Sequence, residues 1–140
     1  QASDRQQAYR QAVRDFALGS APSLLIECDR AIEEGSRALG ELVGRHPEMT
    51  AVFAAGEVWA VGALLECQRR GLDVPRGIAV AGYNDAGLGA HLTPPLTTVR
   101  VPRYEMGQRA ASMILARLAG LPVSEPVVDL GYEILVRGSA

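Results

Sequence analysis

Apolar positions recur along the chain with two alternating periods, one typical of helices and one typical of buried strands. Residues 3–18 carry small and apolar side chains at helical spacing, which predicts an amphipathic helix that ends near Gly19. The apolar run SLLIEC at 23–28 predicts a strand that is buried on both faces. Residues 30–44 predict a second helix with Asp29 as its N-cap and an apolar stripe formed by Ile32, Leu39, Leu42 and Val43.

The same alternation continues to the end of the chain. The further predicted elements are strands at 50–55 (buried), 77–83 and 97–101, helices at 57–70 and 103–119, and one or two final strands within 127–137. Gly71 and Gly120 follow the two helices, where glycine commonly ends a helix.

Strands that alternate with helices predict an α/β fold with a mainly parallel sheet flanked by helices. Such folds usually begin with a central strand, whereas this chain opens on a helix, so we expect one further strand upstream. Ligands of open α/β sheets bind at the carboxyl ends of the strands. This rule selects the loops at 27–30, 55–57 and 83–85, together with Arg103 after the fourth strand.

Composition and charge narrow the class of protein. The chain has 140 residues, 48% hydrophobic and 21% charged, with a formal net charge of -2, as expected for one folded domain and not for a disordered chain. The basic residues are all arginine and are scattered among the acidic ones, so DNA binding would have to reside in another segment. Because no apolar run of about 18 residues occurs, we expect no membrane partner. Cys28 and Cys67 lack the spacing of a metal site, which predicts buried free thiols and no metal.

Sequence motifs of common enzymes are missing as well. Neither His46 nor His91 lies near a nucleophile motif such as GxSxG, and no GxxxxGK[ST] or GxGxxG loop follows a predicted strand. The neighbouring Glu33 and Glu34 are typical of a solvated helix face. We therefore expect a binding protein without a cofactor, in preference to an enzyme on a flavodoxin-like fold.

Four motifs follow one another in the segment from Thr50 to Ala111. They are the strand TAVFAA, the helix segment AVGA, the block GLDVPRGIAVAGYND, and the crossover PPLTTV with the helix segment GQRA after it. With these motifs the chain resembles the effector-binding domain of the LacI/GalR family of bacterial transcriptional regulators. Arg5, Ala8 and Tyr9 resemble the family's R-x-x-G-[FYW] element, with alanine where glycine is usual. PPLTTVRVPRYEMG and DLGYEILVRGSA further resemble the gluconate-operon repressor branch.

The resemblance implies a fold of periplasmic-binding-protein type, with two lobes joined by crossing strands. Residues 1–98 would form most of the three-layer C-terminal lobe. Residues 99–122 would be a crossover strand and helix that belong to the N-terminal lobe, and residues 123–140 would return as strands to the first lobe. The first strand of this lobe, most of the N-terminal lobe and a DNA-binding helix-turn-helix would precede this chain.

The resemblance also implies a ligand site with a positive charge. Arg5, Arg30 and Arg103 would face the cleft between the lobes, where guanidinium groups favour a sugar acid over a neutral sugar. The alternative for each arginine is a solvated surface charge. Asn84 stands where many family members hold sugar hydroxyls with an aspartate, so it would contact the ligand or would serve as a turn residue. Asp85 would have a mainly structural role.

Two positions depart from the family pattern, which has Asn-Asp at 56–57. At Gly56, a ligand-binding position by the resemblance, the loss of the asparagine side chain removes one expected hydrogen-bond partner of the ligand. Glu57 would either contact the ligand or complement the dipole of the helix that begins there.

Homodimers of the family associate through this lobe, which implies an interface, or alternatively core packing, for Val61, Leu64, Leu65, Gln68, Leu88 and Leu92. The implied function is that of a cytoplasmic repressor's effector-binding domain. A sugar or sugar acid, with gluconate as the candidate, would close the two lobes and alter the affinity for operator DNA. The alternative is an extracytoplasmic sugar-binding protein of a transport system, which shares the fold.

Overall fold

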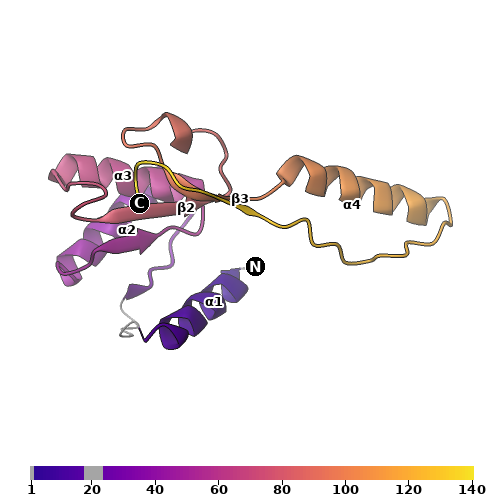
Figure 1. Ribbon diagram of the computed structural model, residues 1–140, viewed down its shortest axis with the longest axis horizontal. Coiled ribbons are helices and arrows are strands. Elements are labelled where there is room, and N and C mark those ends of the chain that lie inside the picture. The colour runs from indigo at the N-terminus through magenta and orange to yellow at the C-terminus, as the bar shows by residue number, and fades with distance from the viewer. Residues whose placement is uncertain (1, 18–23) are drawn as a thin grey trace.

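The computed structural model describes residues 2–17 and 24–140 and confirms the α/β class. In chain order the elements are α1 (Ala2–Asp15), α2 (Ile32–Arg45), β1 (Ala51–Phe53), α3 (Glu57–Arg70), β2 (Ala79–Tyr83), the 3-10 turn η2 (Gly89–His91), β3 (Thr97–Arg100), α4 (Arg103–Leu118) and β4 (Glu133–Leu135), as seen in Figure 1.

The sheet is mainly parallel, as predicted. Its strand order is β1-β2-β3-β4, in which β1, β2 and β3 run parallel and β4 pairs antiparallel with β3. The parallel strands end at one edge, so the loops after Phe53, Tyr83 and Arg100 start there. We call this edge the carboxyl edge.

Helices α2 and α3 pack closely against each other beside the sheet, as Figure 1 shows. The close approach depends on glycine, since a Cβ at Gly35 would collide with the backbone of Trp59 and a Cβ at Gly62 with the backbone of Ile32. Helix α3 also packs on β2. The buried core between these elements consists of Leu39, Ala60, Ala63, Leu64, Cys67, Ile78, Val80 and Leu96.

The other end of the molecule is an arm, which we define as residues 103–132. Figure 1 shows α4 and the chain that follows it projecting away from the sheet. No residue of α4 is buried, and most of its large apolar side chains, among them Tyr104, Ile114 and Leu118, are exposed. The assignment of residues 99–122 to a second lobe stays a prediction.

Several predicted details of the first half of the chain are wrong. Residues 25–28 of the strand expected at 23–28 form no ladder with any described strand, and residue 23 lies outside the described residues. A strand needs a neighbour for its backbone hydrogen bonds, and the described sheet ends at β1 on this side. The same edge position leaves Phe53 of β1 55% exposed, so the strand expected to be buried at 50–55 is not buried.

Helix ends and one cysteine also differ from expectation. Helix α1 stops at Asp15, and Ala17 has a left-handed φ of 50°, while the expected end at Gly19 lies outside the described residues. The N-cap of α2 is Ala31, not Asp29. Both cysteines are free, but Cys28 is only half-buried, whereas burial raises the pKa of the Cys67 thiol to about 11.

Candidate functional site

Arg5 reaches the carboxyl edge from α1. Its Nη1 donates a hydrogen bond to the carbonyl oxygen of Ala55, just after β1, at 3.2 Å. The guanidinium carbon also lies 4.5 Å from the centroid of the Tyr83 ring, at the end of β2. A hydrogen bond and a cation–π contact therefore fix this cation above the ends of two adjacent strands.

The start of α3 lies at the same edge. Gly56 is the N-cap of this helix, and a Cβ there would meet the ring of Trp59 at 2.8 Å. Trp59 donates from Nε1 to the carbonyl oxygen of Asp29 at 2.7 Å, which draws the loop before α2 to this edge. The glycine that departs from the family pattern thus makes room for a tryptophan side chain.

Glu57 is buried, and its carboxylate holds a loop of the same chain. Oε1 accepts hydrogen bonds from the backbone N–H groups of Gly87 at 3.2 Å and Gly89 at 2.8 Å. These contacts give Glu57 a structural role that the sequence analysis did not consider. Direct contact of Glu57 with a ligand stays a prediction.

Asn84 and Asp85 form the turn after β2. Both adopt left-handed backbone conformations, with φ of 92° and 47°. The N–H of Asn84 donates to the carbonyl oxygen of Val99 in β3 at 2.8 Å. Asn84 is thus a turn residue, and its half-buried side chain lies at the carboxyl edge, where the ligand contact remains a prediction.

Asp85 is the centre of an ion-pair network that the sequence analysis missed. Its carboxylate lies 2.8 Å from Arg100 Nη2 and 2.8 Å from Arg137 Nη1. The hydrogen bond from Arg137 is the main cause that holds the pKa of Asp85 below its usual value, and the hydrogen bond from Arg100 lowers this pKa to a smaller extent. Burial of the carboxylate acts in the opposite direction. No local motif could have revealed the network, because Asp85 and Arg137 are 52 positions apart.

The remaining two arginines of the predicted site are exposed. Arg103, the first residue of α4, donates from Nη2 to the carbonyl oxygen of Asp85 at 3.2 Å and so joins the carboxyl edge. Arg30 lies in the loop before α2, next to Asp29. The structure thus brings Arg5, Asn84 and Arg103 to one edge and places Arg30 on the adjoining loop.

The residues predicted for a dimer interface divide into two groups. Val61 and Leu64 are buried within the chain, so the expectation that they contact a partner is corrected to core packing. Leu65, Gln68 and Leu88 are exposed, and Leu92 is partly buried against the core. Only the exposed group is available to a partner.

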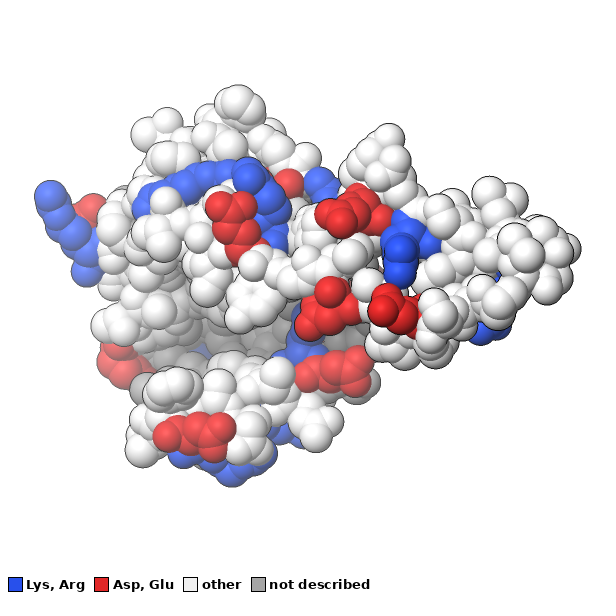
Figure 2. Space-filling model, turned by 45° about the vertical axis from the view of Figure 1, so that its right-hand side comes forward, with Lys and Arg blue, Asp and Glu red and all other residues white. Residues whose placement is uncertain are grey.

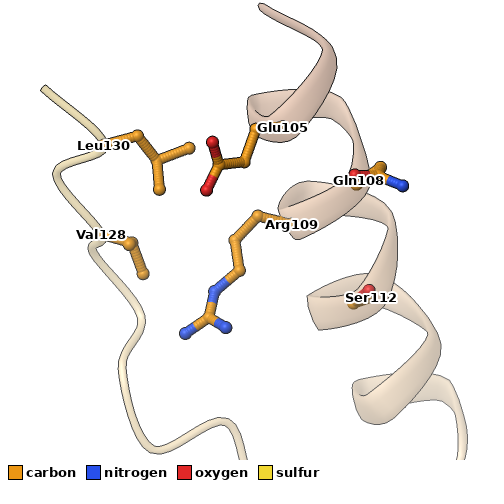
Figure 3. A pocket seen from close by; sticks show the side chains of 6 residues that line it. All are labelled: Glu105, Gln108, Arg109, Ser112, Val128 and Leu130. Atoms are coloured by element: carbon orange, nitrogen blue, oxygen red, sulfur yellow. The ribbon is translucent and has the colours of Figure 1, made fainter. Parts of the chain in front are cut away.

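Two hollows of the surface lie away from the carboxyl edge. One, of about 510 Å³, lies within the arm, where Glu105 and Arg109 of α4 extend toward Val128 and Leu130 (Figure 3). The other, of about 540 Å³, lies over α2 and α3 around Glu66. Acidic and basic side chains are interspersed over the face shown in Figure 2, with no field of a single sign.

Two negative findings apply to the described residues, 2–17 and 24–140. Their Asp, Glu, His and Cys side chains form no group of three or more that would hold a metal ion. None of their helices is long and apolar enough to cross a membrane.

The fold, with its parallel strands ending at one carboxyl edge, is of periplasmic-binding-protein type. Residues 1–140 match the family model described as a periplasmic binding protein-like domain. The chain belongs to this family, and its relatives are LacI-family transcriptional regulators.

Two relatives are transcriptional regulators of Escherichia coli (strain K12). The chain is 35% identical over 135 residues to the HTH-type transcriptional repressor CytR and, with the same identity and length, to the HTH-type transcriptional regulator GntR. Each match covers 96% of this chain and 40% of the relative, so the chain spans well under half of these proteins. Equal identity to both leaves the gluconate branch a prediction.

Solved structures give the same result. A transcriptional regulator CelR–cellobiose complex matches with a TM-score of 0.90 and 33% identity over 99% of this chain and 42% of that chain. The transcription regulator GntR from Chromobacterium violaceum matches with a TM-score of 0.89 and 32% identity over 96% of this chain and 50% of that chain.

Proposed function

We propose that this chain is the effector-binding part of a cytoplasmic, DNA-binding transcriptional repressor, and that the effector is a sugar acid, with gluconate as the first candidate. The regulators CytR and GntR support the general role, since the chain aligns with them over 96% of its length. The relatives named above are regulators, which favours this proposal over a sugar-binding protein of a transport system.

The observation that carries the sugar-acid proposal is the position of Arg5. Its guanidinium is held by Ala55 and Tyr83, and among the described residues its Nε and Nη2 atoms have no hydrogen-bond partner. A guanidinium that is already fixed loses little conformational entropy when it binds a carboxylate with two parallel hydrogen bonds. A neutral sugar would gain less from the same group.

The other predicted contacts complete the proposed site. Arg103 and Arg30 would add positive charge at the rim, and the amide of Asn84 would bind hydroxyl groups without repelling a carboxylate. The backbone at Gly56 and the side chain of Glu57 would border the ligand at the start of α3.

The arm indicates how a ligand would act on a larger protein. In this proposal residues 1–98 and 123–140 form one lobe, and the exposed apolar face of α4, within 99–122, packs in a second lobe. A ligand that contacts both lobes would favour the closed arrangement and so change the affinity for operator DNA. The DNA would be bound by a helix-turn-helix domain in a preceding part of the protein. The protein would act as a homodimer whose interface includes the exposed Leu65, Gln68 and Leu88.

Thermal unfolding of a full-length regulator that carries this chain tests the proposal. The panel consists of gluconate, other sugar acids and their neutral counterparts. A ligand at about 100 times its dissociation constant should add roughly 2.7 kcal/mol of stability. Arg103→Ala should reduce the effect of an acid, whereas Arg117→Ala, at the other end of α4, serves as the matched control. Stabilisation by a neutral sugar alone would refute the sugar-acid effector, and no stabilisation by any member would refute the proposed effector class.

A further inference from the structure

One carboxylate joins the turn after β2 to both strands that connect with the arm. The side chain of Asp85 is only 7% exposed, and its two oxygens bind different arginines. Oδ1 lies 2.8 Å from Nη1 of Arg137, which follows β4 on the return from the arm. Oδ2 accepts from Nε of Arg100, the last residue of β3 before the arm, at 2.9 Å.

The backbone of the same turn is tied to the start of the arm. The N–H of Asn84 binds the carbonyl oxygen of Val99, and the carbonyl oxygen of Asp85 accepts from Arg103. Asn84 and Asp85 both have left-handed backbones, a conformation that Asn and Asp adopt more readily than other non-glycine residues. The ion pairs of Asp85 and these two hydrogen bonds together hold the turn against β3 and the start of the arm.

The two arginines are held to different degrees. Arg137 is anchored to the sheet, because its Nη1 also donates to the carbonyl oxygen of Leu96 at 2.9 Å and its N–H donates to Oγ1 of Thr97 at 2.9 Å. The side chain of Arg100 is 49% exposed and also contacts Glu133 at 3.4 Å. Asp85 thus has one partner, Arg137, that is hydrogen-bonded to the start of β3, and one more exposed partner, Arg100, at the end of β3, where the arm begins. We call residues 100–103 the root of the arm.

We propose that Asp85 is a positioning residue that couples the conformation of the Asn84 turn to the orientation of the arm through its ion pairs with Arg100 and Arg137. A nearly buried carboxylate separates from two arginines only at high cost, so the turn and the two strands move as a unit. A change in the direction of the arm therefore changes the position of Asn84. The importance of this coupling for an effector rests on the proposed function, but the coupling itself does not.

Hydrogen–deuterium exchange of the 140-residue chain, without ligand, tests the coupling. Asp85→Asn keeps the size of the side chain and removes its charge. We expect exchange to become faster, on the order of tenfold, both in a peptide that contains the Asn84 turn and in one from the root of the arm. Peptides from α2 and α3 should be unchanged. Arg100→Gln, which alters a more exposed group, carries the same expectation should Asp85→Asn not fold.

Further variants separate positioning from general stability. Arg137→Gln should reproduce the effect, and Arg137→Lys should restore part of the protection. The double variant with Asp85→Asn should lose less protection than the sum of the two single changes. The matched control is Arg109→Gln, which breaks the ion pair with Glu125 inside the arm and should leave the Asn84 turn unchanged.

Faster exchange in only one of the two peptides would overturn the coupling, and a uniform increase that includes α2 and α3 would reduce Asp85 to a structural residue. Because no ligand is present, failure of the sugar panel refutes only the proposed function. Unchanged exchange refutes the coupling even where a sugar acid binds.

Discussion

Arg5 stacks on Tyr83, with its guanidinium carbon 4.5 Å from the ring centroid, and this contact joins α1 to the end of β2. A cation–π contact of this kind contributes about 0.5–1 kcal/mol at a partly exposed site. Tyr83→Leu should therefore lower the free energy of unfolding by about that amount, measured by urea denaturation. Tyr83→Phe, which keeps the ring, should lower it much less. Equal losses for the two variants would contradict the contact.

Ser139 connects two strands with one hydroxyl group. The buried Oγ donates to the carbonyl oxygen of Val80 at 2.6 Å and accepts from the N–H of Thr97 at 2.8 Å. Ser139→Ala would leave two buried backbone groups without their partner, so we expect a loss of about 2–4 kcal/mol in the free energy of unfolding. Ser112→Ala, at an exposed position of α4, is the control and should be nearly neutral. A loss at Ser139 as small as that at Ser112 would contradict this role of the hydroxyl group.

The ion pairs of Glu66 make the stability of the fold depend on pH. This buried carboxylate contacts Ser36, Arg69 and Arg70, and the hydrogen bond from Arg70 is the main cause that holds its pKa below the usual value of 4.5, against the effect of burial. Because the pKa of Glu66 is lower in the folded state than in the unfolded state, its ionised carboxylate stabilises the fold at pH values above the pKa of the unfolded state. This contribution is lost as the pH falls through the pKa of the folded state. Stability should therefore decrease below about pH 4.5.

The control for this pH dependence is Glu66→Gln, studied by urea denaturation at several pH values. It should be less stable than the wild type at neutral pH and should lose less stability on acidification. A remaining slope is expected from Asp85, whose pKa is also lowered. An unchanged slope would contradict the role of Glu66.

The exposed face of α4 predicts association of the isolated chain. The side chains of Ile114, Leu115 and Leu118 on this helix are all at least 60% exposed. A contiguous exposed apolar patch favours association, because association removes it from water. We expect light scattering to show a mass that rises with concentration, and Leu115→Glu with Leu118→Glu to reduce it. Arg117→Glu, on the same helix, is the charge control. A monomer at all concentrations would refute the prediction.

Local signals explain what the sequence predicted correctly. The bounds of α3 match those expected, because Gly71 supplies the left-handed C-cap, with φ of 67°, that ends the helix. Long-range partners explain what it missed. The run at 23–28 has the composition of a strand, but a strand depends on a neighbour. The contacts of Glu57 with Gly89, and of Asp85 with Arg137, join residues that only the fold brings together.

Calorimetric titration of gluconate into the full-length regulator tests the central claim most directly, namely that Arg5 is held at the carboxyl edge to bind an anionic effector. We predict that gluconate binds saturably to the wild type. Arg5→Ala should lose affinity at least roughly tenfold, as expected when a charged hydrogen bond worth about 1.5–3 kcal/mol is removed. Arg10→Ala, on the same helix, should keep the affinity of the wild type. Equal affinity of the wild type and Arg5→Ala, or no binding of gluconate by the wild type, would contradict it.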